Sequence, residues 1–267
     1  MEVLRILSSA LELLRMVYLP GRKLIGLLIT AVNRPEVLHY LTSFLVKHNM
    51  KPLYTNIASL NGNIEITIFL DVSKTKMPIN KVVKDISGLN DVKDVRVIEP
   101  LFKGLVIDTA HFPILLLGRR AWIIGEAMSK GLFRDVKVEF GEAGRVFLYH
   151  LGVEVGKSIY RSYKDYTTSN KEFLLLIKAL VKAIGWGIVE EFKPFPDGTY
   201  VVRIYDNIEC AMCKPSKEPT GDFFRGIIAG LLLQLTGKMM LVEEVKCIAK
   251  GDPCCEFIAW PMSKTLY

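Results

Sequence analysis

The chain has 267 residues with a formal net charge of +7 and a pI of about 9.1, and half of its residues are hydrophobic. This balance excludes a disordered protein, and the length predicts two domains rather than a single core. The basic residues lie in short groups, such as those at 21–23, 74–76 and 118–120. No run of them forms a recognisable nucleic-acid-binding motif, so contact with DNA stays an open question.

Residues 1–22 predict an amphipathic helix that covers apolar surface on this chain or on a partner. Apolar residues recur there at steps of three and four until Pro20 and Gly21. Charged residues interrupt the pattern well before membrane length, so we expect no signal peptide, no membrane contact and a cytoplasmic protein with reduced cysteines. The apolar positions are Leu4, Leu7, Leu11, Leu14 and Tyr18, and the charged ones are Glu2, Arg5, Glu12 and Arg15.

Residues 23–100 predict a βαββαβ order, which builds an antiparallel sheet with both helices on one face. The expected strands cover 24–34, 51–60, 63–72 and 92–100, and the expected helices cover 36–49 and 79–89. In order and length this part resembles an ACT-type ferredoxin-like domain, a family whose members often bind amino acids and pair with a second copy. The family's first loop often carries a glycine, whereas the loop here reads AVNRPEV. We therefore expect this domain to contact a second copy or a partner protein rather than an amino acid.

Residues 101–267 predict a second α+β domain with four helices and an antiparallel sheet. Gly152 and Gly156 lie one helical turn apart and would let another backbone come close. Hairpin turns are expected at 197–198 and 251–253. The expected helices cover 119–130, 142–164, 170–185 and 223–237, and the expected strands cover 188–196, 200–210, 239–249 and 254–260.

Three of the five cysteines lie in the last hairpin, EEVKCIAKGDPCCEFIAW, residues 243–260. Because side chains at even spacing share one face of a strand, Cys247 and Cys255 can face each other across the turn. Glu244 lies at the edge of the same site. Cys254 points to the opposite face from Cys255, so only one of that pair reaches the site.

Cys210 and Cys213 add a C-x-x-C spacing upstream of the hairpin, which is a common zinc half-site. Thiolates with one carboxylate favour zinc over magnesium or calcium. The sequence therefore predicts a structural zinc ion. The first alternative is that the cysteines are small hydrophobic residues of buried strands. The second is a redox C-x-x-C, which is less favoured because Pro215 and a polar stretch follow where such motifs open a helix.

Five motifs occur in the order typical of the vinyl-reductase-type (4-vinyl reductase, hydrocarbon-binding) domain, which residues 115–262 resemble. They are GRRAWIIGEAM, LYHLGVEVGKSIY, GWG, GIIAGLL and VEEVKCIAKGDPCCEFIAW. The resemblance implies a fold related to subunits of the TRAPP vesicle-tethering complex. The family includes a bacteriochlorophyll-biosynthesis accessory protein and the sensor domains of phenol- and xylene-responsive transcription activators.

In the sensor members a zinc ion is held by three cysteines and one glutamate, and Glu244, Cys247 and Cys255 match that motif. The family's remaining cysteine lies just before the glycine-bearing helix, where this chain has Gly221. Either Cys213 or Cys210 takes its place, or water completes the coordination shell, or the site is empty.

The resemblance also implies an apolar pocket for a small hydrophobic or aromatic molecule. Core packing is the alternative role for each aromatic candidate, and a lone histidine usually satisfies a neighbouring carbonyl. A neutral histidine could also bind a phenolic hydroxyl. The ligand-binding candidates are Trp186, Tyr149, His150, Tyr160, Tyr163 and Phe147.

Three functions are compatible with these features. The first is a regulatory sensor that binds a small apolar ligand in its second domain and transmits the change through a homodimer to a partner protein. The second is a ligand-free assembly module of the TRAPP type. The third is a reductase, but the sequence contains no G-x-G-x-x-G after a strand and no P-loop, and a fully coordinated zinc leaves no open position. We favour the first.

Overall fold

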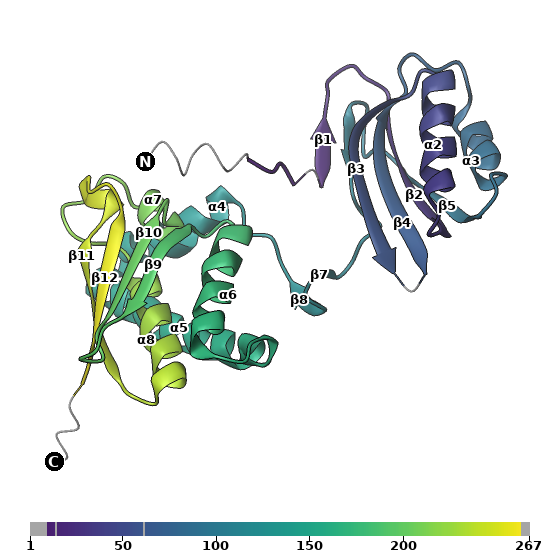
Figure 1. Cartoon of the computed structure of the whole chain (residues 1–267). Helices are drawn as coiled ribbons and strands as arrows, with labels where there is room; N and C mark the ends of the chain where they lie inside the picture. The colour runs from purple at the N-terminus through teal and green to yellow at the C-terminus, as the bar shows by residue number, and fades with distance from the viewer. Residues whose placement is uncertain (1–9, 14, 61, 263–267) are drawn as a thin grey trace. The chain divides into compact units, whose positions relative to one another are not determined.

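A computed structural model describes residues 10–13, 15–60 and 62–262 of the chain (Figure 1). Contacts within the chain divide it into two compact units, Met1–Trp122 and Ile123–Tyr267. The division lies after Trp122 rather than at residue 100, because β6 (Leu105–Ile107) pairs with β1 (Met16–Tyr18) and so belongs to the first unit.

The first unit contains the expected βαββαβ order. It consists of β2 (Leu24–Val32), α2 (Pro35–Lys47), β3 (Lys51–Leu60), β4 (Asn63–Asp71), α3 (Ile79–Ser87) and β5 (Val92–Ile98). The four strands form an antiparallel sheet in the order β3-β4-β2-β5. This topology is ferredoxin-like, and it confirms the fold predicted for this part of the chain.

The two faces of this sheet are both partly covered, because alternate residues of β2 and β4 point to opposite sides. One face packs against both helices and the other against the β1–β6 pair. The core on the helical side includes Ile25, Leu27, Ile29, Ile64, Ile66, Ile68, Leu70, Val37, Leu41, Leu45, Val82 and Ile86, and the core on the other side includes Leu24, Leu28, Phe69, Ile98, Val17 and Val106.

The amphipathic helix expected over residues 1–22 is wrong in the residues that the structure describes. Residues 10–13 are not helical, and Met16–Tyr18 forms β1 with only Val17 buried. The strand forms because Val17 pairs with Val106 of β6 and reaches the second face of the sheet. Residues 1–9 and 14, which carry Leu4, Leu7 and Leu14, lie outside the described residues.

The helix expected over residues 119–130 is also wrong. Leu117 and Gly118 both have positive φ angles, and they reverse the chain so that β7 (Ile114–Leu116) pairs with β8 (Arg119–Ala121). Helical structure begins later, with α4 (Glu126–Ser129), and it continues through a π-helical turn at Lys130–Asp135 into α5 (Val136–Tyr163). The second unit therefore starts with one interrupted helix rather than two separate ones.

The rest of the second unit alternates pairs of helices and strands. A 3₁₀ turn (Lys164–Tyr166) leads to α6 (Asn170–Ala183), and the hairpin of β9 (Ile188–Pro194) and β10 (Tyr200–Tyr205) follows. Next come the short α7 (Ile208–Met212), which the sequence analysis did not predict, and α8 (Asp222–Thr236). The chain ends with β11 (Met240–Lys246), a 3₁₀ turn (Ile248–Lys250) and β12 (Cys255–Pro261).

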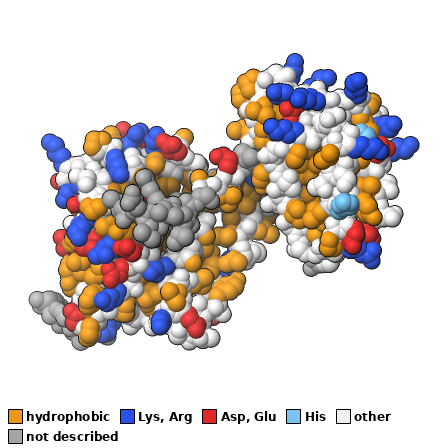
Figure 2. Space-filling model, turned by 45° about the horizontal axis from the view of Figure 1, so that its top comes forward, with side chains coloured by type: hydrophobic (Ala, Val, Ile, Leu, Met, Phe, Trp, Pro, Cys, Tyr) orange, Lys and Arg blue, Asp and Glu red, His pale blue; other side chains and the backbone are white. Residues whose placement is uncertain are grey.

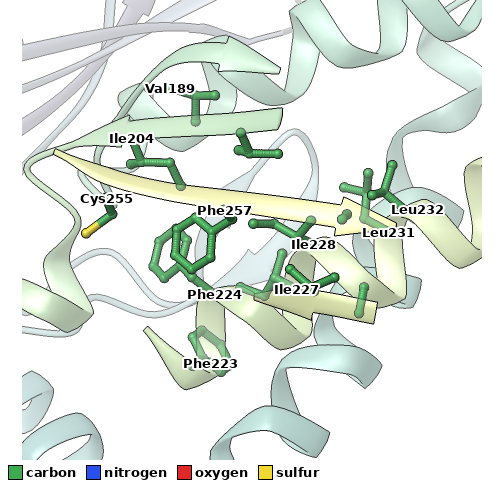
Figure 3. Packing of buried hydrophobic residues seen from close by; sticks show 14 of the residues in the cluster. Val189, Ile204, Phe223, Phe224, Ile227, Ile228, Leu231, Leu232, Cys255 and Phe257 are labelled. Carbon is green, nitrogen blue, oxygen red and sulfur yellow. The ribbon is translucent and has the colours of Figure 1, made fainter. Parts of the chain in front are cut away.

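The strands of this unit form an antiparallel sheet, as the sequence predicts, and their order is β11-β12-β10-β9. Figure 3 shows how its core is built, with Phe257 of β12 meeting Phe224, Ile227 and Ile228 of α8. Cys255 lies at the edge of the same core, so the hairpin that carries the cysteines is held directly against α8.

Helices α5 and α8 are in direct backbone contact. A β-carbon at Gly152 would collide with the carbonyl oxygen of Phe223, and one at Gly156 with that of Ile227. The contact is reciprocal, because β-carbons at Gly226 and Gly230 would collide with the carbonyl oxygens of Tyr149 and Val153. Glycine is therefore required at each of these positions for the two helices to pack as they do.

The surfaces of both units mix charged and apolar side chains. Lys and Arg side chains are spread over both units in Figure 2 and are interspersed with hydrophobic and acidic ones. No described helix combines the length and the low polarity that crossing a bilayer requires.

Candidate metal centre and apolar cavity

Four buried side chains converge at one end of the sheet of the second unit. They are Cys210 of α7, Glu244 of β11, Cys247 just after β11 and Cys255 at the start of β12. One ligand atom from each, three sulfurs and one carboxylate oxygen, lies within 4.8 Å of all the others. Three separate segments of the chain therefore supply a single set of donor atoms.

The local fold explains why Cys247 faces Cys255. Alternation along β11 turns Glu244 inward together with Val242, and the register shifts after Glu244. The chain then enters the 3₁₀ turn, where the Cys247 backbone N–H donates a hydrogen bond of 2.8 Å to the Asp252 carboxylate. Gly251, at φ 103°, adopts the left-handed conformation that closes this turn.

Cys210 reaches the group because a short helix begins directly after β10. The Asn207 side chain caps α7 by accepting a hydrogen bond of 3.0 Å from the Glu209 backbone N–H. Burial of Asn207, Glu209 and Cys210 is complete, with no exposed surface on any of them. The helix therefore places a thiol at a position where the sequence analysis expected the end of a strand.

Hydrogen bonds hold the four donors in a polar pocket within the core. The Cys210 thiol donates to Glu244 Oε1 at 3.4 Å, and the Gly221 backbone N–H donates to Glu244 Oε2 at 2.7 Å. Thr220 Oγ1 lies 3.7 Å from Cys247 Sγ. The loop that precedes α8 thus contributes to the site through its backbone and a hydroxyl group.

Burial and these hydrogen bonds shift the acidities of the cluster. Burial raises the pKa of Glu244 to about 8, whereas hydrogen bonds from Cys210 and Cys255 lower the pKa of the Cys247 thiol. The same bond with Cys247 raises the pKa of Cys210. Without a cation, the cluster therefore favours one thiolate stabilised by neighbouring thiols, which is a donor set that a soft divalent metal can displace protons from.

The structure separates the two cysteines of the C-x-x-C. Cys210 belongs to the cluster, whereas Cys213 ends α7, is only half-buried and is not part of the group. Gly221 occupies the position where the resembled family has a cysteine, and a β-carbon there would approach Glu244 Oε2 and Phe257 Cζ at 2.9 Å. Of the alternatives left open by the sequence, the structure brings Cys210 to Glu244, Cys247 and Cys255.

A second buried polar group, absent from the sequence analysis, lies beside the cluster. The Glu209 carboxylate accepts hydrogen bonds of 3.0 Å from the backbone N–H groups of both Phe223 and Phe224, at the N-terminus of α8. Lys137 of α5 donates to Glu209 Oε1 at 2.7 Å and also to the carbonyl oxygen of Thr220. Burial raises the pKa of Glu209, and Lys137 partly offsets that rise. The adjacency of Glu209 to Cys210 was the available sequence signal.

An apolar cavity of about 40 Å³ lies between the helices and the sheet of this unit. Every residue that lines it is hydrophobic, and α6, α8, β9 and β10 supply most of them. The lining residues are Ile159, Ile177, Leu180, Val181, Ile184, Trp186, Val189, Phe192, Val202, Ile204, Phe224, Ile227, Ile228 and Leu231.

Among the ligand-binding candidates from the sequence, Trp186 lines this cavity and the others do not. Tyr149 packs against the core with the Arg225 guanidinium over its ring, and Tyr160 packs edge-on against Phe173. His150 and Phe147 are exposed on α5. Tyr163 is half-buried and borders a shallow hollow on the same helix.

Comparisons with known proteins agree with the motifs of the last hairpin. Residues 200–261 match the vinyl-4-reductase domain family, so the chain contains a domain of this type. The uncharacterized protein MJ0855 of Methanocaldococcus jannaschii is 38% identical over 115 residues, which are 42% of this chain and 48% of that protein. The chain thus spans about half the length of this relative.

Two solved structures are similar to parts of the chain. The phenol-responsive sensory domain of the transcription activator PoxR, solved with phenol, is 20% identical with a TM-score of 0.48, covering 55% of this chain and 79% of that one. The ACT domain from the GTP pyrophosphokinase of Chlorobium tepidum is 11% identical with a TM-score of 0.25, covering 29% of this chain and 99% of that one.

Proposed function

We propose that the vinyl-4-reductase domain of this chain is a ligand-binding regulatory module that takes a small apolar molecule into the cavity between α6, α8 and the sheet. The observation that carries this proposal is the lining of the cavity, which is hydrophobic throughout. A hydroxyl or a charge placed there would lose its hydrogen bonds to water and gain none from the aliphatic walls. The cavity therefore favours a hydrocarbon such as toluene over a phenol.

The size of the cavity sets a condition on this binding. An apolar cavity of roughly 150 Å³ accommodates benzene. The cavity here measures about 40 Å³, so an aromatic ring enters only when the lining side chains move apart. Binding would then be coupled to a change in the packing of the domain, which is what a sensor requires.

We also propose that Cys210, Glu244, Cys247 and Cys255 hold a structural zinc ion. Tetrahedral zinc with sulfur ligands at about 2.3 Å brings its donor atoms to within about 3.8 Å of one another. The donors of this cluster already lie within 4.8 Å, and the set of three thiols and one carboxylate suits zinc. Bound zinc would supply cross-linking of α7 to the last hairpin, because four protein ligands leave no coordination position for a substrate.

Helix α8 connects the two proposed sites. The residue before its first turn, Gly221, binds Glu244 of the cluster, while Phe224, Ile227 and Leu231 further along line the cavity. A metal that fixes the start of α8 would keep one wall of the cavity in place. We therefore assign the cluster a supporting role and the cavity the role of the sensor.

A binding experiment with toluene tests the proposal. Trp186 lines the cavity, so we expect toluene to change its fluorescence with a saturable dependence, and phenol to bind at least about tenfold more weakly. The V181F variant, which fills the cavity, should lower toluene affinity about tenfold or more. L175F is the matched control, because Leu175 is 56% exposed on the same helix. Equal toluene affinity in V181F and the unsubstituted protein would contradict the assignment.

A further inference from the structure

The outward face of α5 carries an apolar ridge. Gly141 has a non-helical backbone (φ 54°, ψ −131°), so the continuous part of the helix runs from Glu142 to Tyr163. On this part, Phe147 is 58% exposed and Leu151 is 36% exposed. Val155 follows one turn later, and residues four apart form a ridge along a helix surface.

A shallow hollow lies on the same helix, beyond the ridge. Its volume is about 340 Å³, and it is lined by residues of α5 alone. Two of them, Ser158 and Ser162, are small and lower this part of the surface. The full lining is Glu154, Val155, Ser158, Ile159, Ser162 and Tyr163.

We propose that α5 is a homodimer interface in which Phe147 of each copy occupies the hollow of the other. A two-fold axis that crosses α5 near Gly152 and Val153 brings each Phe147 ring opposite the Ser158 region of the second copy. This point is also the middle of the continuous helix from Glu142 to Tyr163. A knob and a hollow placed symmetrically about the centre of one helix are what a self-complementary, two-fold contact requires.

The charges on α5 favour the same pairing. Antiparallel crossing at Gly152 places Glu142 across from Arg161, and His150 across from Glu154, of the second copy. The side chains of Glu142 and Glu154 are 85% and 66% exposed, so both can reach a partner. Parallel pairing would instead place Glu142 beside Glu142, which like charges disfavour.

Packing inside the unit leaves this face available. The opposite face of α5 carries Gly152 and Gly156 against α8, so the helix is fixed to its own domain by one side and presents the ridge on the other. The proposed interface does not depend on the ligand or on the metal, because none of its residues belongs to the cavity-lining set except Ile159.

Sedimentation of the full chain over a range of concentrations tests the interface. We expect a dimer whose dissociation constant rises at least about tenfold in F147E, because a buried aromatic is replaced by a charge. L241E is the matched control, because Leu241 is equally exposed, at 57%, on the sheet of the same unit. Both variants replace exposed residues, so circular dichroism should show unchanged folding.

Charge reversal tests the two-fold register. R161E should weaken the dimer, because the new carboxylate at position 161 would face Glu142 of the second copy, and E142R combined with R161E should restore it. A double variant no tighter than R161E alone contradicts this register. A monomer at every concentration, or an unchanged dissociation constant in F147E, overturns the proposal and points to another occupant of this face or another interface.

Discussion

Position 221 shows how a single residue decides the composition of the metal cluster. A side chain there would displace the Glu244 carboxylate or the Phe257 ring, whereas glycine leaves its N–H free to bind that carboxylate. The third thiol then comes from Cys210, on a helix whose N-cap and first turn are buried. Exchange of the cysteine between two segments thus keeps three thiols and one carboxylate together.

Replacement of Cys247 by serine should remove the metal and destabilise the second unit. A hydroxyl is a poor zinc ligand, and the lost site would otherwise contribute several kcal/mol of folding free energy. We expect no retained zinc by native mass spectrometry and a clearly lower melting temperature. C213S is the control, because Cys213 lies outside the cluster. Equal metal content in C247S and the unsubstituted protein would argue against the site.

Residue patterns predicted part of this site. Glu244, Cys247 and Cys255 follow from strand alternation and from the resemblance, because both depend on local spacing. Cys210 and Cys213 could not be told apart, since their selection depends on α7, a helix of five residues with no periodic signal of its own. Glu209 could not be assigned a partner, because its contacts come from Lys137 and the start of α8, far away in the chain.

At the scale of elements, the glycines of α5 and α8 are the feature best predicted from sequence. The spacing of Gly152 and Gly156 predicts a close backbone contact, and the contact with Phe223 and Ile227 is of this kind. Elements without periodicity were predicted less well. Val17 forms a strand only because β6 lies beside it, and β7 and β8 depend on positive φ angles at Leu117 and Gly118.

Substitution of Gly156 by alanine should separate α5 from α8. The new methyl group would meet the Ile227 carbonyl oxygen and the Leu231 backbone nitrogen, so the helices must move apart at a cost of about 1–3 kcal/mol or more. Chemical denaturation should measure this loss. G131A serves as the control, since a β-carbon at Gly131 meets nothing within 4 Å. A similar change in both variants would contradict the contact.

At the scale of the molecule, each unit has a core of its own. One core joins the ferredoxin-like sheet to α2 and α3, and the other joins α8 to the second sheet. Composition and element order predicted this division in kind, because each half has its own set of helices and strands. The exact division after Trp122 was not predictable, since it depends on the long-range pairing of β1 with β6.

A metal chelator should therefore change the unfolding of one unit only. The cluster lies wholly in the second unit, so removal of zinc should lower one melting transition and leave the other in place. Trp186 and Trp260 both belong to the second unit, and their fluorescence should follow the shifted transition, while circular dichroism reports both. An equal shift of both transitions would show that the units do not unfold separately.

The glycine contacts also determine which part of the cavity wall can act as a lid. Because α5 and α8 meet backbone to backbone, they have little freedom to slide and behave as one stiff body. Helix α6 contains no glycine, and it is joined to β9 through Gly185 and Gly187, both at positive φ angles. A molecule entering the cavity would therefore displace α6 about this joint, and the hinged helix would report its presence to the protein surface.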